Sequence, residues 1–186
     1  MTEAPHGNYI AGRWTQAGDA VANVNPSDLD DVIGRYAHAG AAETEEAIAA
    51  AKRAFPAWSS ALPEARQTPL ERIGDELIAR KDELGQLLSR EEGKPLAEGV
   101  GEVARAGQFF KFYAGETLRL HGDFTPSVRP GVEVEVRRQP LGVVGIITPW
   151  NFPAAIPAWK IAPALAYGNT VVFKPAELVP GTAWAL

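Results

Sequence analysis

The sequence contains no cysteine, and this absence excludes several kinds of chemistry at once. Within these 186 residues there can be no disulfide, no thiolate metal ligand and no thiol nucleophile. The three histidines, His6, His38 and His121, are scattered along the chain without the spacing of a metal site. We therefore expect no metal centre.

Positive charge and long apolar runs are also scarce. Eighteen Lys and Arg residues against 23 Asp and Glu give a formal net charge of -5, which argues against a nucleic-acid partner. No apolar run reaches the roughly 18 residues that a membrane span needs, and the N-terminus lacks the layout of a signal peptide. We expect a cytoplasmic protein that binds neither nucleic acid nor membranes.

The hydrophobic pattern predicts short strands followed by three amphipathic helices. The first helix is expected over Glu43–Trp58. The second should open with a capping box at Thr68-Pro69 and end at Gly93. The third should start at Pro95 and keep an apolar face as far as Leu118. Three such helices indicate a helical layer packed against a sheet. The short strands are expected at residues 9–10, 13–14 and 32–37.

Residues 132–137 alternate strictly between valine and charged side chains, with glutamate or arginine at every second position. This alternation predicts a strand with one face in water, after a loop over residues 122–131. Two interpretations stay open for it. It is either an ordinary antiparallel strand or an arm that pairs with another subunit, because an exposed strand edge invites pairing.

The most informative stretch runs from Leu141 to Glu177. An apolar strand, which we expect to be buried on both faces, covers residues 142–147 and leads into a polar turn at residues 148–153. A helical stretch follows, and then a second apolar strand over residues 170–173. Strand, turn, helix and strand in this order are typical of a nucleotide-binding βαβ unit, whose chemistry lies at the carboxyl ends of the strands.

The polar residues after these two strands are the candidate site. Asn151 could face a ligand, or it could simply cap the following helix. Lys174 and Glu177 could bind ribose hydroxyls or phosphate, or they could form a solvated ion pair. A glycine pattern at Gly99 and Gly101 matches a loosened dinucleotide fingerprint, but it lies inside a helical pattern and follows another helix. We interpret that match as chance.

The ordered motifs identify a family resemblance that covers essentially the whole chain. The chain resembles the aldehyde dehydrogenase superfamily, which implies an α/β fold. The expected domains are strands and a helical layer of the cofactor domain over residues 1–131, an oligomerisation-arm strand over 132–139, and the first βαβ of a Rossmann-like NAD(P)-binding domain over 140–186. The motifs are Y-I-A-G-R-W at 9–14, N-P at 25–26, E-G-K-P at 92–95, P-W-N-F-P at 149–153, A-W-K-x-x-P-A-L at 158–165, G-N-T-V-V at 168–172 and K-P-A-E at 174–177.

The resemblance also implies roles for individual residues. Asn151 resembles an oxyanion-hole asparagine, whose amide donates to the charge that develops on an aldehyde oxygen. Lys160 resembles a lysine that relays protons, although a structural role is equally compatible with the sequence. The cofactor would be NAD or NADP, with Glu177 favouring NAD because a carboxylate repels a 2′-phosphate. The residues expected along the cofactor are Ile147, Thr148, Pro149, Trp150, Asn151, Lys174, Ala176 and Glu177.

The resemblance further implies oxidation of a small-molecule aldehyde to a carboxylate by a homo-oligomer. Within the superfamily the chain looks most like α-ketoglutaric semialdehyde dehydrogenases, with succinate-semialdehyde dehydrogenases as near neighbours. The reaction needs a cysteine nucleophile and a glutamate base, which the family places beyond the motifs present here. We therefore expect the fold to be incomplete and the chain to be an inactive N-terminal portion of an enzyme. The alternative is a non-catalytic assembly or binding module.

Overall fold

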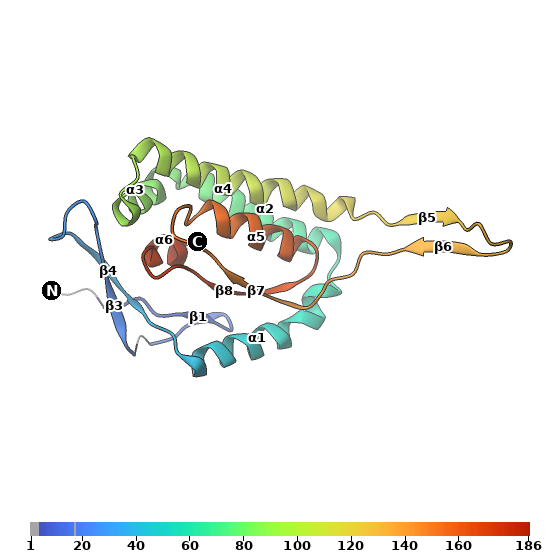
Figure 1. Ribbon diagram of the computed structural model, residues 1–186, viewed down its shortest axis with the longest axis horizontal. Helices are drawn as coiled ribbons and strands as arrows, with labels where there is room; N and C mark the ends of the chain where they lie inside the picture. Colours follow the sequence, from blue (N-terminus) through green and yellow to red (C-terminus); the bar gives the residue numbers. More distant parts are fainter. Residues whose placement is uncertain (1–3, 17) are drawn as a thin grey trace.

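A two-stranded parallel sheet lies at the centre of the molecule, between two helices (Figure 1). The computed structural model describes residues 4–16 and 18–186. Strand β7 (Val143–Ile147) pairs in parallel with β8 (Thr170–Lys174), and helix α5 (Ala155–Ala166) connects them. Helix α1 (Ala41–Ser59) packs against the strands from the other side. This arrangement confirms the predicted βαβ unit.

Three further helices form an outer layer: α2 (Pro63–Ala79), α3 (Lys81–Glu92) and α4 (Leu96–Glu116). Helices α4 and α2 pack on α5, and α3 packs on α4. The helical layer therefore reaches the sheet through α5, whose sequence is apolar enough to be covered by α4 on one side and by the strands on the other. No helix in the described part of the chain is both long and apolar enough for a bilayer crossing. The main core cluster consists of Leu70, Leu77, Leu84, Leu88, Val103, Ala106, Phe110, Ala114, Ala154, Ala158, Ala162 and Ala166.

The prediction for the second helix was wrong in two respects. Helix α2 begins at Pro63, where a proline at the first helical position loses no hydrogen bond, and Pro69 lies inside it. The hydroxyl of Thr68 donates to the carbonyl of Glu64 at 3.0 Å instead of capping a helix. The predicted single helix is also interrupted at Arg80, the boundary between α2 and α3.

The ends of the neighbouring helices agree better with the sequence. Gly93 ends α3 with a φ of 81°, a left-handed conformation that favours glycine. The carbonyl of Pro95 accepts hydrogen bonds from the first turn of α4, which confirms the predicted start. Leu96 and Leu118, however, are 55% and 52% exposed, so the buried face of this region is shorter than expected at both ends. Residues 117–119 form a short 3-10 helix, η1.

Short elements flank this centre. The predicted strands β1 (Tyr9–Ile10), β2 (Arg13–Trp14) and β4 (Val32–Ala37) are present. Strand β3 (Ala20–Val24), which pairs with β4 in antiparallel register, was not predicted. Its two valines are separated by alanine and asparagine, which give only a weak strand signal, and the pairing with β4 supplies what the local sequence lacks. A last helix, α6 (Pro180–Ala185), follows β8.

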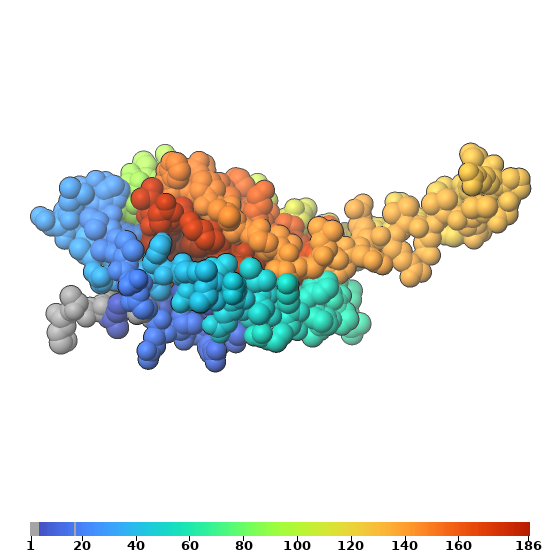
Figure 2. All heavy atoms as spheres, turned by 60° about the horizontal axis from the view of Figure 1, so that its bottom comes forward, coloured from blue at the N-terminus to red at the C-terminus, as the bar shows by residue number. Residues whose placement is uncertain are grey.

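A β-hairpin arm extends away from the body of the molecule (Figures 1 and 2). It consists of β5 (Asp123–Pro126) and β6 (Glu133–Val136), so the loop predicted for residues 122–131 contains a strand. All residues of β6 are exposed, and the expected single wet face is therefore also wrong. Among the described residues no second layer covers either face of the arm, and a local alternation pattern cannot reveal this.

Candidate functional site

The carboxyl ends of β7 and β8 bring the predicted site residues to one edge of the sheet. Ile147 lies directly opposite Lys174 in the parallel ladder. The backbone N–H of Thr148 donates to the carbonyl of Lys174 at 3.4 Å, which extends the pairing by one step. The turn after β7 and the turn after β8 therefore begin side by side, as expected for the binding edge of a βαβ unit.

The turn after β7 presents several of its side chains to solvent. Trp150 is 54% exposed, and Pro149 and Asn151 are exposed as well. Ile147 is 81% exposed, which contradicts the expectation that this strand is buried on both faces. The reason is that β7 has a single partner, β8, among the described residues. The two ends of the turn are buried, since Thr148 is 5% exposed and Pro153 is fully buried.

Asn151 does not cap helix α5. The N-cap is Ala154, which has no side chain able to cap, and no other side chain within the helix replaces it. The carboxylate of Glu102 on α4 performs this task, because its Oε1 accepts hydrogen bonds from the backbone N–H groups of Ala154 at 2.9 Å and Ala155 at 3.1 Å. The alternative interpretation of Asn151 as a helix cap is therefore wrong. Its exposed amide is left at the edge of the sheet.

Lys174 and Glu177 form an ion pair at the end of β8, with Nζ and Oε2 3.2 Å apart. Both side chains are well exposed, at 60% and 76%. A hydrogen bond from its own backbone N–H and the ammonium of Lys174 lower the pKa of Glu177, so its carboxylate is ionised at neutral pH. Ala176 between them is buried, and any contact it makes with a ligand would come from its backbone.

Helix α6, which follows the turn after β8, is held at its start by a second buried carboxylate. Glu91 at the end of α3 is 3% exposed and accepts hydrogen bonds from the backbone N–H groups of Gly181 and Thr182 at 2.6 and 2.7 Å. The amide of Asn23 and the hydroxyl of Thr182 donate to the same carboxylate. Burial raises the pKa of Glu91, and these hydrogen bonds act in the opposite direction. The two helices that follow the two strands are thus each capped by a glutamate from the outer layer.

Two other sequence candidates lie apart from this edge. Lys160 is exposed in the middle of α5, and no hydrogen bond or ion pair found among the described residues joins it to Asn151. Gly99 and Gly101 lie inside α4, where Gly99 is packed against the backbone of Gly85 on α3. That position confirms that the glycine pattern is not a nucleotide-binding loop.

The sequence reasoning missed Glu91 and Glu102. A signal for both was present, because each occupies a position on the apolar face of its helix. Glu91 follows Leu88 by three residues, and Glu102 precedes Ala106 by four. A carboxylate at such a position must find buried donors or an ion-pair partner.

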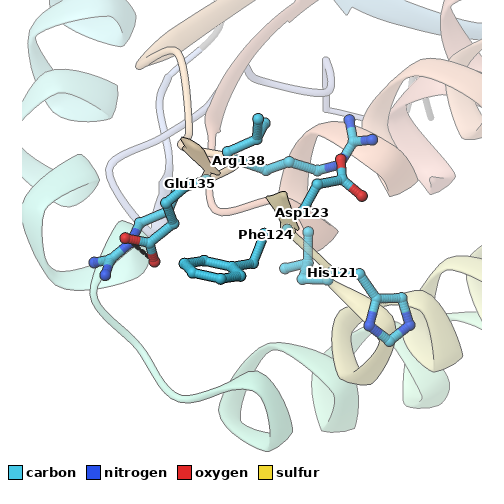
Figure 3. A pocket seen from close by; sticks show the side chains of 9 residues that line it. His121, Asp123, Phe124, Glu135 and Arg138 are labelled. Atoms are coloured by element: carbon cyan, nitrogen blue, oxygen red, sulfur yellow. Dashed lines mark hydrogen bonds and ion pairs between the residues drawn. The ribbon is translucent and has the colours of Figure 1, made fainter. Parts of the chain in front are cut away.

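A hollow of about 440 Å³ lies elsewhere, at the base of the arm (Figure 3). Figure 3 shows around it Phe124 and Glu135 from the two strands of the hairpin and His121 from the segment just before β5. None of its lining residues belongs to the turns after β7 or β8. It is therefore separate from the candidate site.

Comparison with known proteins decides the family. The model of the aldehyde dehydrogenase family matches residues 14–186. The chain belongs to the aldehyde dehydrogenase family. The resemblance inferred from the sequence motifs is thereby confirmed, as is the α/β fold that it implied.

Similar aldehyde dehydrogenases are considerably longer than this chain. The alpha-ketoglutaric semialdehyde dehydrogenase of Bacillus subtilis is 44% identical over 171 residues, which are 91% of this chain and 35% of that protein. The succinate-semialdehyde dehydrogenase [NADP(+)] GabD of Escherichia coli is 42% identical, over 95% of this chain and 37% of its own length. The crystal structure of PnpE in complex with nicotinamide adenine dinucleotide superposes with a TM-score of 0.89 at 40% identity, over 95% of this chain and 37% of that one.

Proposed function

We propose that this chain provides the cofactor-binding and oxyanion-stabilising side of an active site that oxidises a semialdehyde, such as α-ketoglutaric semialdehyde, to its carboxylate. The observation that carries the proposal is the shared edge of β7 and β8, where Asn151 follows one strand and the Lys174–Glu177 pair follows the other. Family membership and the names of the similar semialdehyde dehydrogenases support the substrate class.

The residues at this edge fit NAD or NADP. Lys174 has an exposed ammonium that can donate to a ribose hydroxyl, and Glu177 has an ionised carboxylate that can accept from one. The same negative charge disfavours a 2′-phosphate, which supports NAD over NADP. Ile147, Pro149 and Trp150 would form the wall along the cofactor with their side chains, and the buried Thr148 would contribute its backbone. When bound, the cofactor accepts the hydride that leaves the aldehyde carbon.

In this proposal Asn151 acts on the oxygen of the aldehyde. When a nucleophile adds to the carbonyl carbon, negative charge develops on that oxygen, and the side-chain amide N–H of Asn151 donates a hydrogen bond to it. A neutral amide suits this role because it needs no change of protonation state during the reaction. The thiol nucleophile and the general base would come from sequence outside these 186 residues, since the chain contains no cysteine. Alone, the chain would then be inactive. A proton-relay role for Lys160 and a cytoplasmic location both stay predictions.

The test is to express the longest reading frame that includes this chain and to follow absorbance at 340 nm with NAD and with NADP. We expect semialdehyde-dependent reduction of the cofactor, faster with NAD, and its loss after alkylation of thiols. No reduction of either cofactor with any semialdehyde would contradict the proposal.

A second candidate function, a non-catalytic assembly module, is favoured by the exposed arm. Phe124 on β5 is 67% exposed, and Val134 on β6 is 40% exposed. Apolar side chains on a projecting hairpin are suited to pairing with another copy. Light scattering after size exclusion tests this role. We expect an oligomer that Phe124→Asp dissociates, whereas a wild-type monomer at all concentrations would rule out assembly through the arm.

A further inference from the structure

The turn that carries Asn151 is held from the inside by two charged residues of the outer helical layer. Glu102 on α4 accepts the hydrogen bonds from Ala154 and Ala155 through Oε1, as described above. Its other carboxylate oxygen, Oε2, lies 2.7 Å from the ammonium of Lys94. The Glu102 side chain is only 3% exposed, so both of its oxygens act in a buried setting.

Lys94 extends this contact to Asn151 itself. Its Nζ donates to the backbone carbonyl of Asn151 at 3.1 Å and lies 4.2 Å from the centroid of the Phe152 ring. A second carboxylate oxygen, Oε2 of Glu92, is 3.1 Å from the same Nζ. The Lys94 side chain is 9% exposed. One ammonium therefore connects the buried carboxylate of Glu102 and the partly buried carboxylate of Glu92 with the main chain of the candidate oxyanion donor.

The protonation state of Lys94 favours this connection. Burial by itself lowers the pKa of a lysine, but the carboxylates of Glu102 and Glu92 outweigh that effect and leave the pKa of Lys94 raised. Lys94 is thus an ammonium at neutral pH, with three donors available. Two of these donors meet Oε2 of Glu102 and the Asn151 carbonyl, and Glu92 adds an ion pair without a hydrogen bond.

We propose that Lys94 and Glu102 are positioning residues that fix the turn of residues 151–155, so that the Asn151 amide is held where the oxyanion forms. The proposal rests on the function proposed above for Asn151. Glu102 holds the far end of the turn through two backbone N–H groups, and Lys94 holds its start through one backbone carbonyl. Because an oxyanion donor must be placed to within a fraction of an ångström, release of either end should slow the chemical step.

Amide hydrogen exchange on the 186-residue chain tests the structural half of this proposal. We expect Glu102→Gln and Lys94→Met to accelerate exchange at Ala154 and Ala155 at least tenfold, while Ala162 in the core of α5 keeps its protection. Glu102→Gln keeps the shape of the side chain, so it serves even where Lys94→Met unfolds the chain. Its NH2 group must face either the Lys94 ammonium or the two backbone N–H groups, so one end of the turn loses its acceptor. Unchanged exchange at Ala154 and Ala155 in Glu102→Gln would overturn the proposal.

The matched control is Lys111→Met. Lys111 lies on the same helix, α4, and forms an ion pair with Asp75, but its side chain is 42% exposed. An exposed pair of this kind contributes little to stability. We expect exchange at Ala154 and Ala155 to be unchanged in this variant. Equal acceleration by Lys111→Met and Glu102→Gln would show general loosening of α4 and would also overturn the proposal.

Steady-state kinetics on the longest reading frame test the catalytic half. We expect Glu102→Gln and Lys94→Met to lower kcat about 10- to 100-fold with cofactor KM changed less than twofold, because the turn is displaced while the Lys174–Glu177 pair is not. Lys94→Arg keeps the positive charge and should recover at least tenfold of the loss. A rise in cofactor KM with unchanged kcat would overturn the positioning role. A wild-type protein without dehydrogenase activity would instead refute the proposed function. The exchange experiment would still decide whether Lys94 and Glu102 fix the turn.

Discussion

Replacement of Glu91 by leucine should be among the most destabilising substitutions in the molecule. Leucine has a similar volume but no oxygen, so the donors that now meet the carboxylate lose their acceptor. Three of them are held in place by the fold: the backbone N–H groups of Gly181 and Thr182 and the side-chain amide of Asn23. The leucine side chain also leaves no room for a water molecule to replace the lost oxygens.

The magnitude follows from those three donors. An unpaired buried donor costs about 1–3 kcal/mol, and removal of a buried carboxylate offsets part of the sum because burying a charge is itself unfavourable. We expect Glu91→Leu to lower the free energy of unfolding by about 3–5 kcal/mol. Glu91→Gln keeps one acceptor oxygen and should cost about 1–2 kcal/mol.

Urea denaturation followed by circular dichroism measures these differences. The control is Glu83→Gln on the same helix, where the side chain is 64% exposed and paired with Arg80, and where we expect a change below about 1 kcal/mol. The expected order of destabilisation is Glu91→Leu, then Glu91→Gln, then Glu83→Gln. A Glu91→Leu variant no less stable than the Glu83 control would refute the reasoning, because the carboxylate would then not be the acceptor on which α6 depends.

Two further predictions concern helix packing and pH. Gly107→Ala should lower the melting temperature, because a Cβ there would lie 2.8 Å from the carbonyl of Gly74 on α2, whereas Gly101→Ala on the same helix meets nothing within 4 Å and should raise it. The reverse order would contradict the close approach of α2 and α4. Asp31→Asn should remove a pH-dependent part of the stability. The Arg90 guanidinium lowers the pKa of Asp31 from its usual 3.8, so the stabilisation is present above that value and is lost as pH falls through the lower folded pKa. Denaturation from pH 7 to pH 2 should show the difference from wild type shrinking in acid, and a constant difference would contradict this.

The parts of the fold that follow from local sequence were predictable. The stretch from 141 to 177 contains two apolar runs, each ended by a polar turn, and its order as strand, helix and strand needs no distant contact to be recognised. Gly93 and Pro95 likewise mark a helix end and a helix start through their own backbone preferences. The candidate residues Asn151, Lys174 and Glu177 could be placed at one edge for the same reason.

Features that depend on distant partners were not predictable in this way. The capping of α5 and α6 by Glu102 and Glu91 joins residues 52 and 90 positions apart. The start of the second helix was misplaced because Thr68-Pro69 and Leu62-Pro63 both offer a proline near a helix start, and only packing decides between them. The exposure of Ile147 depends on how many strands pair with β7, which its own apolar sequence cannot indicate.

The central claim is that the two turns at the sheet edge have separate tasks in aldehyde oxidation. Its most direct test is to measure kcat and cofactor KM of Asn151→Ala and Lys174→Ala side by side in the longest reading frame that includes this chain. We expect Asn151→Ala to lower kcat by about 10²–10³ with cofactor KM nearly unchanged, and Lys174→Ala to raise cofactor KM with a much smaller effect on kcat. An unchanged kcat in Asn151→Ala, or an unchanged cofactor KM in Lys174→Ala, would contradict the account.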